Sequence, residues 1–130
     1  MFNQNGESVV AIGGFSPSLY APLTQVTKAL IKSSVGRVYS IAISNDNIAT
    51  RYFQLHNKAT APSATDAPLY SFKVPGGDAN NPGTLIFDQP FFTLAGKEFS
   101  TGIGWAISTT LATFTDSATA SEHIVIVHYL

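Results

Sequence analysis

The sequence contains no cysteine and few charged residues, and both absences narrow what the protein can be. Without cysteine there are no disulfides, no thiolate metal ligands and no cysteine nucleophile. Only 12% of the 130 residues are charged, and seven basic against eight acidic residues leave a net charge of −1. Because lysine and arginine never cluster, the sequence argues against a nucleic-acid partner. So little charge favours a surface that packs against other protein subunits.

Long apolar runs are also missing, so no segment reaches the length of a membrane-spanning helix, and we expect no membrane partner. The length of 130 residues is that of one domain with its own core. Residues 1–22 differ from the rest, because glycines and prolines interrupt them around one short apolar run, residues 9–12, which predicts a short strand. The prediction is an N-terminal arm over residues 1–22 and a single domain over residues 23–130.

What the sequence does contain is a series of short stretches in which apolar and polar residues alternate. In residues 35–44 the alternation predicts that Val35, Tyr39, Ile41 and Ile43 share a buried face and that Val38 lies on the opposite face. Such a period of two is typical of a half-buried β-strand. This segment is therefore the clearest strand in the chain.

A second strand follows directly. Residues 45–47, Asn-Asp-Asn, favour a turn, and residues 49–56 alternate again, so the two segments predict a β-hairpin that places Arg37 near Arg51. The β-branched content of residues 23–32 favours a strand there as well. Further strands are expected at residues 69–74, 84–88, 91–94, 98–109 and 122–130, the last as an interior strand buried on both faces.

This succession of short strands without a clear helix predicts an all-β protein. The architecture that suits it is an antiparallel β-sandwich, and about eight strands in two sheets suit a jelly roll. The small residues opposite Trp105 in residues 98–109 predict the close approach of another backbone. The expected core consists of Tyr39, Ile41, Ile43, Phe53, Leu55, Phe72, Phe87, Ile103, Trp105, Ile107 and alternate residues of 124–129.

The residues that catalysis or metal binding needs are scattered along the chain. His123 and His128 are five residues apart, so one strand directs them to opposite faces and they cannot chelate one ion together. With His56 they are interpreted as surface or strand-end histidines. The aspartates lie at expected turns, and residues 78–81 lack the glutamate that would complete a calcium loop. We therefore predict no enzymatic activity, no cofactor and no metal.

Four stretches, in this order, resemble small β-sandwich structural proteins of tailed bacteriophages, of the capsid cement or decoration type. They are residues 36–39 (GRVY), 54–62 (QLHNKATAP), 74–77 (VPGG) and 99–103 (FSTGI). The resemblance covers about residues 31–109. It implies a jelly-roll-like domain, commonly trimeric and without enzymatic activity. The implied partners are the major capsid protein and further copies of the chain, and the implied location is the capsid surface of a virion after synthesis in the host cytoplasm.

The arm lies outside the region of resemblance, and its apolar residues are the candidates for contact with other subunits or with the capsid. These candidates are Phe2, Val9, Val10, Phe15 and Tyr20. Packing of the arm on the body of its own chain is an equal alternative. The alternative function is a carbohydrate- or receptor-binding module of a phage tail or fibre, in which exposed Tyr52, Tyr70 or Tyr129 would stack on a sugar.

Overall fold

The computed structural model of the protein describes residues 17–87, 92 and 94–130, and β-strands make up nearly all of its regular structure. The single short exception is a 3₁₀ turn, η2 (Ala120–Glu122), among these residues. The strands are β1 (Ser18–Tyr20), β2 (Lys28–Lys32), β3 (Gly36–Asn45), β4 (Arg51–His56), β5 (Tyr70–Val74), β6 (Gly83–Phe87), β7 (Lys97–Phe99), β8 (Ile103–Ser108) and β9 (His123–Tyr129).

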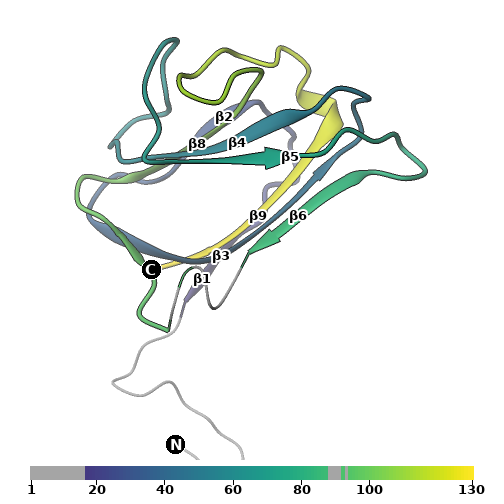
Figure 1. The fold of residues 1–130 in the computed structure, drawn as a ribbon. Coiled ribbons are helices and arrows are strands. Elements are labelled where there is room, and N and C mark those ends of the chain that lie inside the picture. Colours follow the sequence, from purple (N-terminus) through teal and green to yellow (C-terminus); the bar gives the residue numbers. More distant parts are fainter. Residues whose placement is uncertain (1–16, 88–91, 93) are drawn as a thin grey trace, which may run out of the picture.

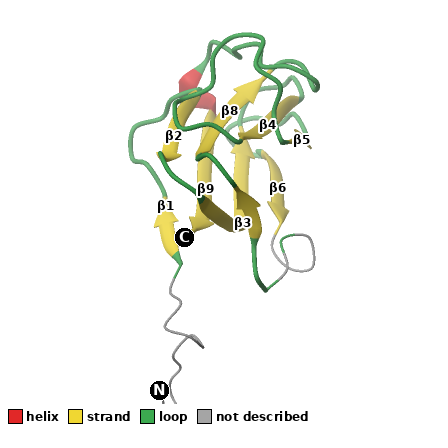
Figure 2. Cartoon of the chain, turned by 90° about the vertical axis from the view of Figure 1, so that its left-hand side faces the viewer, coloured by secondary structure: helices red, strands yellow, loops and turns green. Residues whose placement is uncertain are grey.

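These strands form two antiparallel sheets that face each other as a β-sandwich, which confirms the predicted fold class (Figure 1). The five-stranded sheet has the order β1-β9-β3-β6, with β7 also paired to β3. Figure 2 shows β1, β9, β3 and β6 side by side. The four-stranded sheet has the order β2-β8-β4-β5. Each sheet turns one apolar face inward, because burial of both faces against each other removes them from water.

The core between the sheets contains most of the residues predicted for it. Ile41, Ile43, Phe53, Leu55, Ile103, Trp105 and Ile107 are buried, and Phe72 and Phe87 are half-buried against them. The Trp105 side chain is only 1% exposed. Its ring stacks on Phe53 at a centroid distance of 6.0 Å and meets the edge of Tyr20 at 6.2 Å. Trp105 is thus a core residue, as predicted.

The predicted hairpin between residues 35–44 and 49–56 is wrong. β3 pairs with β6, β7 and β9, whereas β4 pairs with β5 and β8 in the other sheet. The turn itself exists, because Asn45 Nδ2 donates to the carbonyl oxygens of Ala49 and Pro75, both at 3.0 Å. The chain reverses but crosses to the opposite sheet, so the apolar faces of β3 and β4 join one core instead of lying side by side.

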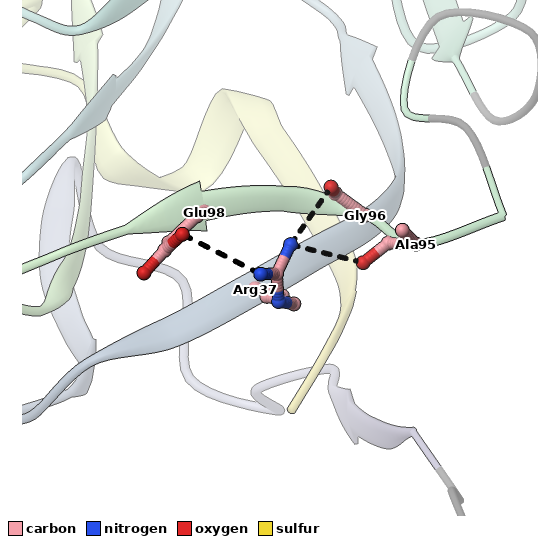
Figure 3. A network of polar contacts seen from close by, with 4 residues as sticks. All are labelled: Arg37, Ala95, Gly96 and Glu98. Atoms are coloured by element: carbon pink, nitrogen blue, oxygen red, sulfur yellow. Dashed lines mark hydrogen bonds and ion pairs between the residues drawn. The ribbon is translucent and has the colours of Figure 1, made fainter.

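The expected proximity of Arg37 and Arg51 fails for the same reason. Arg37 lies instead beside β7, where its guanidinium group donates to the carbonyl oxygens of Ala95 and Gly96 at 3.3 and 3.4 Å (Figure 3). It also forms an ion pair with Glu98 at 3.4 Å. Both side chains are largely exposed, so this pair contributes little stability. The contacts of Arg37 with the two carbonyl oxygens hold the turn before β7 against β3.

The predicted faces of Val38 and Tyr39 are also wrong. The register between β3 and β9 shifts between Val38 and Ser40, as it does where a β-bulge inserts one extra residue. A shift of one residue exchanges the two faces of a strand. Val38 is consequently buried and Tyr39 only half-buried, while Ile41 and Ile43 keep their predicted inward direction. Val35, also predicted to face inward, precedes β3 and is 54% exposed.

β9 is not buried on both faces. Val125 and Val127 point into the core, but Ile124 is 54% exposed and His128 is exposed. The strand is central in hydrogen bonding, with β1 on one side and β3 on the other, yet the described residues leave one face of its sheet open to solvent. The continuous apolar run at residues 122–130 predicted that both faces of the strand are buried, but the fold buries only one of them.

The predicted strand at residues 23–32 is partly wrong. β2 begins at Lys28, so the first half of the predicted strand 23–32 is a loop, in which Leu23 is fully exposed. The predicted strand 9–12 lies outside the described residues. Of the predicted strand 91–94, only Phe92 and Leu94 are described, and neither is in a strand.

Candidate functional site

The interface residues predicted from sequence are mostly outside the described part of the chain. Phe2, Val9, Val10 and Phe15 belong to residues 1–16. Tyr20 is described: it lies on β1, is half-buried and packs its ring against Trp105. Tyr20 thus contributes to the core, and an interface role for it stays a prediction.

The outward side of the five-stranded sheet is the candidate functional surface. Pairing between β1, β9, β3 and β6 aligns its side chains in three rows across the sheet. The rows are Leu19–His128–Ser40, Ile126–Ala42–Ile86 and Ile124–Ser44–Thr84. We call these nine residues the isoleucine face. Ile86 is 70% exposed and Leu19 is 58% exposed, so the apolar side chains of this face are available for contact.

Two shallow hollows adjoin the isoleucine face, and Ile124 and Ile126 line both of them. The hollow on the β6 side measures about 170 Å³, and the hollow on the side of the β1–β2 connection measures about 390 Å³. The remaining lining residues are Ala42, Ile43, Ser44, Thr84 and Ile86 in the first, and Ala21, Pro22, Leu23, Gln25 and Val125 in the second. None of them is charged. A contiguous apolar area of this kind is typical of a surface for protein contact.

The outward side of the four-stranded sheet is different, because two loops cover it. All of β8 is buried. A methyl group on Gly104 would lie 3.1 Å from the Thr60 carbonyl oxygen, and one on Gly102 would lie 2.4 Å from that of Lys58. The small residues of β8 therefore admit the backbone of the loop after β4, which confirms the predicted close approach.

The second loop, between β8 and η2, is held by side chains that point outward from β4 and β8. Gln54 Nε2 donates to the carbonyl oxygens of Thr110 and Thr113 at 3.0 and 3.1 Å. Ser108 Oγ donates to the Thr113 oxygen at 3.1 Å and accepts from the Thr115 N–H at 2.9 Å. Gln54 and Ser108 are both fully buried, so these hydrogen bonds satisfy groups that would otherwise be costly to bury.

The surface interpretation of His56 is wrong, because this histidine is completely buried beneath the same loop. Its Nε2 lies 3.1 Å from Gln54 Oε1 and its ring meets the face of Phe114 edge-on at 6.4 Å. Burial lowers the pKa of His56 to about 4, although the Asp66 carboxylate opposes that shift. Since Gln54 Oε1 accepts, the neutral ring carries its proton on Nε2, and the buried Nδ1 has no partner among the described residues.

His123 is likewise buried rather than exposed, and burial lowers its pKa. His128 is exposed, which confirms that the two histidines of β9 point to opposite faces. The Nδ1 of His128 lies 2.7 Å from Ser40 Oγ. The neighbours of His128 in its row are Leu19 and Ser40, so the sheet places no carboxylate there to orient the imidazole as in a catalytic triad.

The remaining candidates for chemistry have structural surroundings. Asp78 Oδ1 accepts the N–H groups of Asn80 and Asn81, both at 2.8 Å, as expected of a turn aspartate. Residues 17–87, 92 and 94–130 contain no group of three or more potential metal ligands. The three tyrosines considered for sugar binding, Tyr52, Tyr70 and Tyr129, are half-buried.

Comparison with protein-family models, with curated proteins and with solved structures finds no match to this chain. In the described part of the chain, no helix has the length and apolar character needed to cross a membrane. The function must therefore be argued from the chain itself.

Proposed function

We propose that this protein is a structural protein of a tailed-phage virion, a cement or decoration protein that binds the outer surface of the head and stabilises the shell. The isoleucine face is the observation that carries the proposal, because an uncharged apolar surface suited to protein contact is expected of a subunit that works within an assembly of many protein copies. The resemblance of residues 31–109 to virion proteins supports a phage virion as the assembly to which this protein belongs.

The order of the strands supports the finer assignment of a jelly roll. The chain crosses between the two sheets after β1, β2, β3, β5, β7 and β8, and so winds both sheets around one core. Two Greek keys folded together produce crossings of this kind. A jelly roll has its loops at the two ends and leaves a sheet face free, and the described residues leave the isoleucine face uncovered.

We propose further that the protein acts as a homo-oligomer, a trimer according to the resemblance, and that the N-terminal arm contributes to its contacts. Several attachment points per oligomer multiply a modest affinity for the major capsid protein. With 12% charged residues and a net charge of −1, contact with the shell is mainly apolar. Its strength is accordingly only weakly dependent on salt.

The test is a thermal-release assay on particles with and without the protein, at low and at high salt. A ligand bound only to the intact shell stabilises it by mass action, so particles without the protein release their genome at lower temperature. The difference persists at high salt. Equal release temperatures contradict the cement role and favour a host-binding or tail role, and a specific glycan-array signal without binding to capsids favours the carbohydrate-binding alternative. A stabilisation abolished by moderate salt keeps the role but refutes the apolar interface.

A further inference from the structure

We propose that the isoleucine face receives residues 9–12 (Val-Val-Ala-Ile) of a neighbouring copy of this chain. The inference rests on the homo-oligomer of the proposed function, whereas stabilisation of the shell does not depend on that oligomer. It names a neighbouring copy as the occupant of the face, and the contacts with the shell belong to other surfaces.

The chemistry of the segment matches that of the face. Residues 9–12 are uncharged and form the longest apolar run before β1, and the residues lining the two hollows are uncharged as well. In an extended segment, alternate side chains point the same way. Ile124 and Ile126 stand between the hollows, so a segment laid across them places apolar side chains in the hollow on each side.

The exposed apolar surface of the face favours a segment over a second rigid domain. Leu19, Ile86 and Ile124 are between 54% and 70% exposed. At roughly 100 Å² for a fully exposed side chain, these three offer about 180 Å² of apolar surface. A stable contact between two globular proteins buries about 800 Å² on each partner, of which a little more than half is apolar. These side chains supply less apolar surface than such a contact uses, whereas four residues of extended chain can be accommodated on them.

The geometry of β1 favours a neighbouring copy as the source of the segment. Ser18 pairs with Tyr129 and Tyr20 with Val127, so β1 begins at the end of β9 that lies away from Ile126. To reach the hollows of its own sheet, residues 9–12 would have to turn back before β1, and Gly13 and Gly14 are the nearest glycines in the sequence for such a turn.

A hairpin turn at these two glycines would bring Val9 back only to the level of Ser18 and Tyr129. At about 3.4 Å per residue, residues 9–12 would then end about 10 Å short of Ile126. Residues 9–12 of another copy are free of this tether and reach both hollows.

The experiment compares molar masses by light scattering for two double variants and one control. The arm variant carries Val9→Asp and Val10→Asp, and the face variant carries Ile86→Asp and Ile124→Asp. Both should weaken association about tenfold to hundredfold, the effect of losing a buried valine or isoleucine, and so shift the mass toward the 13.8 kDa of one chain. The control Ile48→Asp changes an isoleucine that is 91% exposed in the β3–β4 turn and should leave the mass unchanged. Circular dichroism verifies that each variant keeps its β-structure.

Mixing the arm variant with the face variant identifies the source of the segment. The intact arm of one then meets the intact face of the other, and a species of two chains should appear although each variant alone is monomeric. A mixture that stays monomeric overturns the proposal, as does a wild-type protein of 13.8 kDa or an arm variant of unchanged mass. The cement role is measured separately on particles, so a monomeric protein that still raises the release temperature discards the docking and retains the function.

Discussion

Acidification should destabilise this protein through His56 more than through an ordinary surface histidine. The ring is completely buried, and its lowered pKa of about 4 means that it stays neutral in the folded protein at pH 5. In the unfolded chain the pKa returns to about 6.5. Between these two values the unfolded state binds more protons than the folded state, so stability falls as the pH falls. Below about pH 4 both states are protonated and the loss from His56 ends.

The magnitude follows from the two pKa values. Lowering the pH from 7.5 to 5.0 should remove about 2 kcal/mol of unfolding free energy through His56, and lowering it to 4.0 should remove about 3 kcal/mol. The physical cause is burial, which disfavours the charged ring. A protonated ring would also carry a buried N–H on Nδ1, an atom without a partner among the described residues. A loss of this size is a substantial part of the stability of a domain.

The assay is urea unfolding at pH 7.5 and pH 5.0, followed by the fluorescence of the single tryptophan, for wild type and for His56→Gln. The glutamine does not titrate and can still donate to Gln54 Oε1. Its unfolding free energy should depend less on pH, by about 2 kcal/mol over this interval. His123, whose pKa is also lowered, is present in both proteins and cancels in the difference. If the two proteins lose the same stability on acidification, His56 is not the neutral buried group described above.

Two other predictions concern the core and the covered sheet. Trp105→Ala should cost about 3–5 kcal/mol of unfolding free energy, because it removes a large buried ring; a loss below about 1 kcal/mol in a urea titration followed by circular dichroism contradicts this. Gly102→Ala should cost about 1–3 kcal/mol, because the new methyl group would lie 2.4 Å from the Lys58 carbonyl oxygen. Gly104→Ala, with 3.1 Å to the nearest atom, is the matched control and should cost less; equal costs for both refute the steric explanation.

Local patterns in the sequence were sufficient for the fold class and much of the core. Alternation of apolar and polar residues is a direct consequence of strand geometry, so it identified β4, β5 and β8 and the burial of Phe53, Leu55 and Trp105. Turn residues such as Asp78 were equally clear, because their backbone preferences are local. The arrangement of an antiparallel sandwich followed from the number and spacing of such segments.

Pairing of the strands depends on contacts between distant residues, and here the sequence was insufficient. The Asn-Asp-Asn turn after β3 determines that the chain reverses but not in which sheet the next strand lies, and β4 joins the opposite sheet. The bulge between Val38 and Ser40 arises from the register with β9, nearly 90 residues away. No local pattern specifies either feature.

What covers each sheet was also decided only by the tertiary structure. His56 has the sequence position of a strand-end histidine, but a loop more than 50 residues later folds over it and removes it from water. Ile124 and Ile126 belong to a run that reads as fully buried, yet the described chain leaves the outward side of their sheet open. The sequence by itself determined which residues are apolar and which segments are strands. Only the packing of distant segments decided which apolar residues are buried in the core and which form the isoleucine face.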